Sequence, residues 1–255
     1  MARQQSLVRA LSALIVLGLS MPQLRAGAGS AGTRYVVFFD LSSSPRSCDR
    51  DAWAGFAETA VIRQLRPGDA LTIYPIGPDT LGAAAIFSRV APAVPKNHGI
   101  DALMATTVAL ARIRTGAVAA LRQAMAARPT STRRTDVLSS LDRYEADLRR
   151  RMVVLFLSDM LHADRDLNLE RQEITTGQIA AVVRALASQR QWRTDQLAGA
   201  RVYCLLSSQS VAQFSAATDR RVLKQFYQMV FQTVGARLMR FDTNIDPSSL
   251  TEDEP

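Results

Sequence analysis

Short apolar runs alternate along the chain with longer stretches in which apolar residues recur at helical spacing. The short runs are rich in β-branched and aromatic residues, which favours buried strands, and spacings of three and four residues predict helices with one buried face. Strands that alternate with helices are typical of a parallel sheet covered on both faces. The pattern therefore predicts an α/β fold with a doubly wound, Rossmann-like, mostly parallel sheet flanked by helices.

These elements account for one domain from residue 33 to residue 242. Gly116 lies inside the longest helical pattern and predicts a break there, and Gly235 is placed to cap the last helix. Residues 243–255 form a polar, acidic tail, which we expect to be loose from Asp246 onward. The expected strands are 35–39, 70–76, 84–90 at an edge, 152–157, 202–206 and 238–241, and the expected helices are 51–65, 101–127, 137–150, one around 179–186, and 222–234.

The first residues have the three-part layout of a secretory signal peptide. Arg3 and Arg9 precede the apolar run Ala10–Leu19, and small residues follow around Ala28. The apolar run has about half of the roughly 20 residues that a helix needs to cross a membrane. We therefore expect residues 1–28 to be removed, leaving a mature protein without a stable membrane span, in the bacterial periplasm or secreted.

The basic charge of the chain does not indicate nucleic-acid binding. The formal net charge is +8, and loss of the three arginines before residue 28 lowers it to about +5. The basic residues are nearly all arginine, and a group such as Arg149–Arg151 is expected at a helix end, where cations meet the helix dipole favourably.

The two cysteines, Cys48 and Cys204, are expected in a loop and in a buried strand. Export to an oxidising compartment would permit a disulfide between them. The alternative is one buried apolar thiol and one free thiol. The sequence leaves both states open, because it does not give the distance between their Cα atoms.

Polar and acidic residues follow two of the expected strands directly. The first strand ends in Asp40-Leu41-Ser42-Ser43-Ser44, and the strand 152–157 ends in Ser158-Asp159. In a doubly wound sheet, ligands bind beyond the carboxyl ends of the strands, where the strand order reverses. We expect these two strand ends to lie side by side and to form a binding site.

Asp40, Ser42 and Ser44 reproduce the Asp-x-Ser-x-Ser motif of the metal-ion-dependent adhesion site, and in this the chain resembles the von Willebrand factor type A domain family. Thr135 matches the family's threonine in the loop before the third main helix. Asp159 matches its aspartate after the fourth strand. The resemblance extends over about 210 residues in the order of the elements.

The resemblance implies a divalent cation, Mg²⁺ or else Mn²⁺ or Ca²⁺, bound through oxygen ligands. It implies direct coordination by the hydroxyls of Ser42, Ser44 and Thr135, with Asp40 and Asp159 acting through water or by holding the hydroxyls. The cation would accept an acidic side chain from a protein partner that the sequence does not identify. The implied function is therefore metal-dependent protein binding, without catalysis.

The chain also departs from the family pattern. Glycines usual beside the threonine and after the second aspartate are replaced by Arg134 and Met160, and Thr132 is a less favoured substitute for Thr135. These departures leave open a scaffold of the same fold that binds its partner without metal.

The main alternative to a metal-dependent binding module is an enzyme, a haloacid-dehalogenase-type phosphatase. Asp40 would be its nucleophile, and Asp159 and Asp164 would bind Mg²⁺. Residue 42, however, is a serine where such enzymes have an aspartate as general acid, and a hydroxyl cannot perform that proton transfer near neutral pH. The lysine expected between the acid motifs could only be Lys96, in a proline-rich loop. We therefore expect no enzyme activity and keep the phosphatase as the less favoured alternative.

Other catalytic patterns are missing from the sequence. The two histidines are His98 and His162, and no serine forms a nucleophile elbow. The glycines form no phosphate-binding loop of the nucleotide-binding types. His162 is expected on a solvated loop, with the rim of the metal site as the alternative.

Overall fold

The computed structural model describes residues 31–94, 99–127, 135–143, 150–169, 171–207 and 219–251. These residues belong to one compact unit, Ala31–Pro255. The expected signal peptide, residues 1–28, lies outside the described residues, so its removal stays a prediction.

A six-stranded sheet runs through this unit, in the order β3-β2-β1-β4-β5-β6. Neighbouring strands are parallel, except that the edge strand β3 is antiparallel to β2. The order reverses between β1 and β4, which is the arrangement of a doubly wound sheet, so the predicted fold class is confirmed. The strands are β1 (Ala31–Asp40), β2 (Ala70–Ile76), β3 (Phe87–Val90), β4 (Arg150–Leu157), β5 (Arg201–Leu205) and β6 (Arg237–Asp242).

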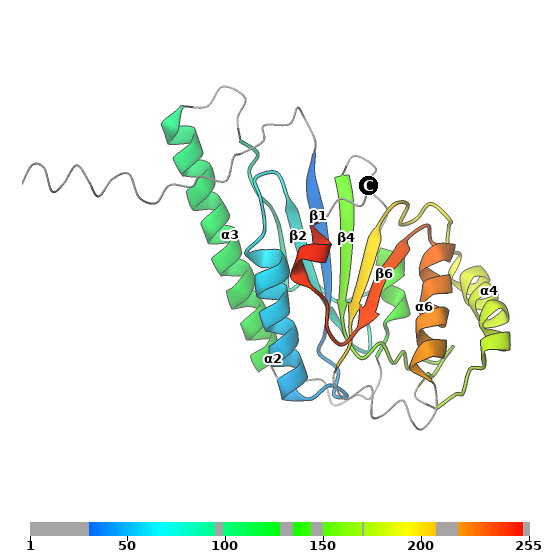
Figure 1. The fold of residues 1–255 in the computed structure, drawn as a ribbon. Helices are drawn as coiled ribbons and strands as arrows, with labels where there is room; N and C mark the ends of the chain where they lie inside the picture. Colours follow the sequence, from blue (N-terminus) through cyan, green and yellow to red (C-terminus); the bar gives the residue numbers. More distant parts are fainter. Residues whose placement is uncertain are drawn as a thin grey trace, which may run out of the picture. The chain divides into compact units, whose positions relative to one another are not determined.

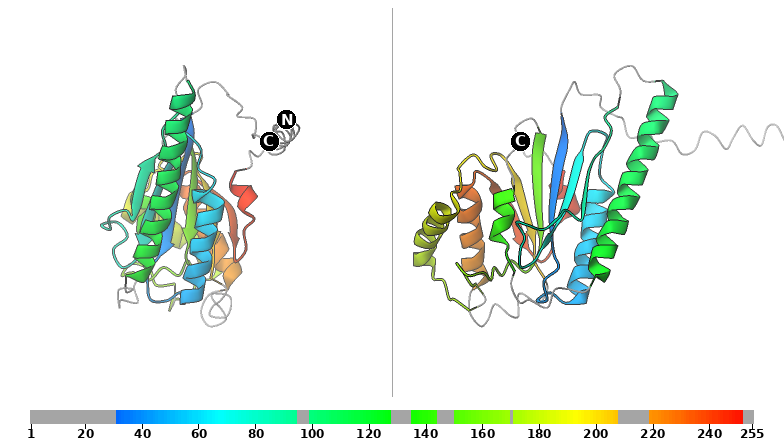
Figure 2. Two further views of the ribbon diagram at one scale, coloured as in Figure 1. Left: turned by 90° about the vertical axis from the view of Figure 1, so that its left-hand side faces the viewer. Right: turned by 180° about the vertical axis from the view of Figure 1, so that it is seen from behind.

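Helices cover both faces of this sheet, as Figure 1 shows nearly edge-on and Figure 2 from the side and from behind. One layer contains α2 (Ser47–Phe56), the π-helix η1 (Ala57–Ile62), α3 (Ile100–Ala126) and the 3-10 helix η4 (Pro247–Leu250). The other layer contains the 3-10 helix η2 (Leu138–Arg143), α4 (Ile179–Arg190) and α6 (Arg220–Thr233). The 3-10 helix η3 (Thr176–Gln178) leads into α4.

The central strand β1 joins the two layers into one core. Its side chains alternate between the faces, because successive residues of a strand point in opposite directions. Val36 and Phe38 pack with α4, α6 and η2, whereas Val37 and Phe39 pack with α2, η1 and α3. Burial on both faces explains why the sequence of β1 is a continuous apolar run.

The helix predicted over 137–150 is wrong for the described residues of that range. These residues form only the short η2 and the start of β4, so Arg150 and Arg151, expected at a helix end, lie in a strand. At the start of η2 the Asp136 carboxylate accepts a hydrogen bond from the backbone N–H of Ser139, and the Ser140 hydroxyl donates to the carbonyl of Val137. Such side-chain bonds to the backbone compete with a regular α-helix.

The longest helix, α3, is continuous, so the predicted break at Gly116 is also wrong. A Cβ at Gly116 would lie 3.5 Å from the ring of Phe87 on β3, which places this turn of the helix against the sheet edge. Among the described helices, α3 alone is long and apolar enough to span a membrane. This is weak evidence of a span, because helices packed on a protein core have the same composition.

The described part of the C-terminal tail is not loose. Ile245 and Leu250 are buried in the layer of α2 and α3. The guanidinium of Arg201 donates to the Leu250 carbonyl at 2.6 Å, and the Tyr203 hydroxyl donates to the Ser249 carbonyl at 2.7 Å. Side chains of the sheet therefore bind the backbone carbonyls of the tail. The polar composition of the tail gave no indication of these contacts.

The two cysteines are both free thiols, so the disulfide does not form. Cys48 is exposed and lies in α2 rather than in a loop, and Cys204 is buried in β5 as expected. Burial raises the pKa of the Cys204 thiol well above its usual value. Cys204 therefore behaves as an apolar core residue.

Candidate functional site

The carboxylate of Asp40 lies fully buried where β1 ends. The parallel register pairs Phe39 with Leu157, which brings Asp40 beside Ser158 at the end of β4. The Ser158 hydroxyl donates to Asp40 Oδ2 at 2.6 Å, and the backbone N–H of Ser42 donates to Oδ1 at 2.9 Å. The two expected strand ends are therefore joined through the Asp40 side chain.

Burial raises the pKa of Asp40, because a carboxylate loses its hydration there. The hydrogen bonds from Ser158 and Ser42 and the positive charge of Arg50 act in the opposite direction. Since burial is the largest effect, the surrounding protein groups stabilise the charge of Asp40 only in part.

The serines of the motif lie close together above this carboxylate. Ser42 Oγ and Ser44 Oγ are 3.0 Å apart, with Ser42 buried and Ser44 half-buried. Arg50 of α2 donates from Nη2 to the Ser42 carbonyl at 2.6 Å, and the N–H of Leu41 donates to the Ile76 carbonyl at 3.1 Å. The motif loop is thus held by both α2 and the end of β2.

Thr135 reaches the same edge of the sheet from a segment distant in sequence. It pairs with Ala163 in an isolated antiparallel bridge, and the N–H of Asp136 donates to the carbonyl of Gly77 after β2. Thr135 is 1% exposed, and its hydroxyl has no hydrogen-bond partner among the described residues. A buried hydroxyl in this state is uncommon, because it gives up hydration without a replacement.

Asp159 directly follows Ser158 and is also buried. Its Oδ1 accepts a hydrogen bond from the N–H of Leu161 at 3.0 Å. Burial raises the pKa of the Tyr227 hydroxyl well above its usual value, and the nearby negative charges of Asp159 and Asp40 act in the same direction. Four of the five candidate residues, Asp40, Ser42, Ser44 and Asp159, therefore lie at or just after the carboxyl ends of β1 and β4, and the fifth, Thr135, is joined to the segment after β4 by its bridge to Ala163.

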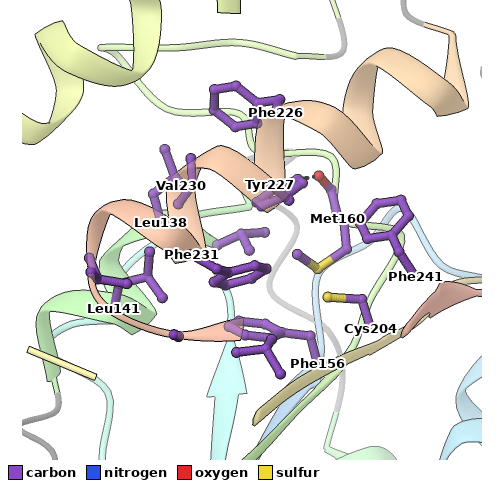
Figure 3. Packing of buried hydrophobic residues seen from close by; sticks show 14 of the residues in the cluster. Leu138, Leu141, Phe156, Met160, Cys204, Phe226, Tyr227, Val230, Phe231 and Phe241 are labelled. Atoms are coloured by element: carbon purple, nitrogen blue, oxygen red, sulfur yellow. Dashed lines mark hydrogen bonds between the residues drawn. The ribbon is translucent and has the colours of Figure 1, made fainter. Parts of the chain in front are cut away.

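Met160 has a backbone conformation that favours glycine, with φ at +61°. Its N–H donates to the Ser158 hydroxyl at 3.0 Å, and its carbonyl accepts from the Tyr227 hydroxyl at 2.8 Å. Figure 3 shows the buried Met160 side chain near Cys204 and Phe241, and the hydrogen bond from Tyr227 as a dashed line. The loop thus makes a left-handed turn at a residue other than glycine. Arg134 lies outside the described residues.

Three residues of this arrangement were missed by the sequence reasoning. Ser158 was recognised as a strand end, but its bond to Asp40 depends on the register of β1 and β4. Arg50 and Tyr227 belong to helices whose orientation toward the site follows only from packing. No spacing in the sequence signals these contacts.

His162 is fully buried, so the expectation of a solvated loop histidine is wrong. Burial and the positive charge of Arg190 lower its pKa to about 4, against the opposing charges of Asp164 and Asp166. The imidazole is therefore neutral at pH 7. Its Nδ1 lies 3.8 Å from Asp136 Oδ1.

The sequence matches no family model. No curated protein matches it either. Solved structures similar to the fold include a von Willebrand factor type A protein from Catenulispora acidiphila (13% identity, 86% of this chain and 40% of that chain, TM-score 0.41). A second is the ArnB paralog VWA2 from Sulfolobus acidocaldarius, with 13% identity over 88% of this chain and 44% of that chain and a TM-score of 0.42. A third is an aerotolerance-related membrane protein from Bacteroides fragilis, with 11% identity over 86% of this chain and 97% of that chain and a TM-score of 0.38. This chain spans less than half the length of the first two, and the likeness assigns no function, partner or location.

The left-handed backbone of Met160 predicts that glycine is more stabilising than alanine at this position, which is the reverse of their usual order. Met160→Ala and Met160→Gly both remove the buried side chain, but only glycine relieves the left-handed strain, which costs about 1 kcal/mol or more. Met160→Gly should therefore be more stable than Met160→Ala by about 1 kcal/mol in urea unfolding. At Gly55, an exposed α2 position with open space around it, alanine should be the more stable residue by about 0.5–1 kcal/mol. A Met160→Ala protein as stable as Met160→Gly would contradict the assigned backbone conformation.

Burial of a neutral His162 predicts a specific dependence of stability on pH. The folded pKa of about 4 lies below the unfolded value of 6.5, so the unfolded chain binds more protons between these values. The contribution of His162 is fully present above pH 6.5 and is lost as the pH falls toward 4. With chelator present, the stability advantage of wild type over His162→Asn should shrink by about 3 kcal/mol between pH 7 and pH 4. An advantage that stays constant over this range would show that His162 is not buried in its neutral form.

Proposed function

We propose that this chain is an exported, cation-dependent protein-binding module that holds Mg²⁺, or else Mn²⁺ or Ca²⁺, at Asp40, Ser42, Ser44, Thr135 and Asp159. The observation that carries the proposal is the buried Thr135 hydroxyl without a hydrogen-bond partner among the described residues. Leaving a buried hydroxyl unsatisfied costs about 1–3 kcal/mol. A cation at this edge would supply the missing interaction.

The set of donor atoms also fits such an ion. All five side chains offer oxygen, which is the ligand type that Mg²⁺ prefers. Ser42 Oγ and Ser44 Oγ already lie 3.0 Å apart, and Asp40 has a raised pKa because burial removes its hydration. A nearby cation would favour the charged form of this carboxylate.

Protein binding follows from the balance of charge in this proposal. Three of the five residues are neutral hydroxyl ligands, and the Asp40 carboxylate is already engaged by Ser158 and Ser42. The bound cation would attract an acidic side chain of a partner protein into its open position. We propose binding without catalysis, which is what the resemblance of the Asp40–Ser44 motif to the adhesion site implies. Export remains part of the proposal, on the basis of the N-terminal sequence pattern.

Thr135→Val provides a selective test, because it removes the unpartnered hydroxyl and keeps the shape of the side chain. In chelator, the variant should be as stable as wild type or more stable. Millimolar Mg²⁺ should raise the melting temperature of wild type but not that of Thr135→Val, since only the form that binds the ion is stabilised by it.

Asp40→Asn and Thr106→Val are the companions in this measurement. Asp40→Asn should lose the Mg²⁺ response, whereas Thr106→Val should keep it, because the buried Thr106 hydroxyl donates to the carbonyl of Ala102 inside α3. An equal Mg²⁺ response in wild type and Thr135→Val would refute the assigned ligands. No response to any of the three cations, even at high concentration, would favour the scaffold that binds without metal.

Arg50 predicts a second effect on the same site. Its positive charge acts on Asp40, and its guanidinium donates to the carbonyl of Ser42, so it opposes a cation held nearby. Arg50→Gln should tighten Mg²⁺ binding about three- to tenfold in calorimetric titration, by removing about 1 kcal/mol of repulsion. Arg50→Lys keeps the charge and should leave the affinity close to that of wild type. Weaker binding in Arg50→Gln alone would show that Arg50 matters for the shape of the loop and not through its charge.

A further inference from the structure

A second group of ligand-type side chains lies beside the oxygen site. Asp136 directly follows Thr135, and His162 and Asp164 flank Ala163, which pairs with Thr135. One ligand atom from each of Asp136, His162 and Asp164 lies within 4.8 Å of the other two. Asp136 thus comes from one strand of the bridge, His162 and Asp164 come from the other, and the three side chains converge.

The imidazole of His162 is unsatisfied in either neutral form. If the proton is on Nδ1, the lone pair of Nε2 is buried with no partner among the described residues. If the proton is on Nε2, that N–H is buried without an acceptor among the described residues. Nδ1 then accepts one long hydrogen bond, from the N–H of Leu138 at 3.5 Å, and lies 3.8 Å from Asp136 Oδ1. A buried imidazole with such contacts is costly. A cation between the three side chains would bond to Nδ1, the ring nitrogen on the side of Asp136, with the proton on Nε2.

Arg190 is the cationic side chain described next to this group. Its Nη1 donates to Ser139 Oγ at 2.9 Å and to Asp142 Oδ2 at 3.0 Å. Its Nη2 lies 4.0 Å from Asp136 Oδ1 and 3.7 Å from Asp164 Oδ2, beyond hydrogen-bond distance. Arg190 therefore makes hydrogen bonds with Ser139 and Asp142 and only longer ion pairs with Asp136 and Asp164, so the oxygens of these two carboxylates are still open to a divalent cation.

The mixed ligand set separates this group from the oxygen site. A neutral imidazole with two carboxylates suits Zn²⁺ and similar transition metals, whereas Mg²⁺ prefers oxygen ligands alone. The side chain of Asp164 is 30% exposed, so the group of three reaches solvent at this residue.

We propose that Asp136, His162 and Asp164 form a second cation site, which takes Zn²⁺ or a similar imidazole-binding divalent ion. Bound there, the ion ties the segment that carries Thr135 to the segment that follows β4. The site does not depend on a cation at Asp40, and its metal differs in chemical class.

Calorimetric titration of the purified protein with Zn²⁺ tests this proposal, in millimolar Mg²⁺ to fill the oxygen site. Cys48→Ser serves as the background for all variants, because an exposed thiol such as that of Cys48 is itself a ligand for Zn²⁺. We expect one equivalent of Zn²⁺ to bind, and His162→Asn to weaken binding at least about 100-fold. Asp164→Asn should give a similar loss, and its half-exposed position makes the variant a safe second choice if His162→Asn does not fold.

Two further variants give the comparison that decides the result. His98→Asn, at the one other histidine of the chain, should bind Zn²⁺ like the background, and so should Thr135→Val, which lacks a ligand of the oxygen site. Unchanged Zn²⁺ affinity in His162→Asn and Asp164→Asn would overturn the proposal, as would loss of binding in His98→Asn. Because Thr135→Val removes the Mg²⁺ response and not the Zn²⁺ response, failure of one site is distinguishable from failure of the other.

Discussion

The hydrogen bond from Ser158 to Asp40 joins the buried carboxyl ends of β1 and β4, and the candidate site depends on it. These strands lie next to each other where the strand order reverses, so the loops that follow them open toward opposite layers of helices. Asp40 also accepts from the N–H of Ser42 and so shapes the serine loop. One buried carboxylate therefore fixes the strand ends and the hydroxyl ligands together.

A chain of hydrogen bonds extends this arrangement into the core. Tyr227 of α6 holds the carbonyl of Met160, whose N–H donates to Ser158, which in turn donates to Asp40. The left-handed backbone of Met160 costs energy, and the packing of its side chain around α6 offsets that cost. The site is thus rigid on the Asp40 side, whereas Thr135 and His162 keep buried polar atoms without partners among the described residues. A buried hydroxyl without a partner calls for an explanation, and a bound cation would supply one at Thr135.

The sequence predicted the parts of this structure that follow from local pattern. The strand β2 was predicted at its observed bounds, and the motif from Asp40 to Ser44 lies at the end of a buried strand as expected. The pattern failed where tertiary contacts override it. Residues after Val137 form a short 3-10 helix, where the side chains of Asp136 and Ser140 bond to the backbone. The tail is held through its carbonyls by Arg201 and Tyr203. The burial of His162 and the backbone of Met160 depend on neighbours distant in sequence, so no local signal predicted them.

The most direct test of the central claim is to locate a cation in crystals of the protein grown with millimolar Mn²⁺, which anomalous scattering identifies. The account predicts a peak about 2 Å from the Thr135 hydroxyl and from the hydroxyls of Ser42 and Ser44. Crystals that contain Mn²⁺ elsewhere, with the Thr135 hydroxyl still without a partner, would contradict the account.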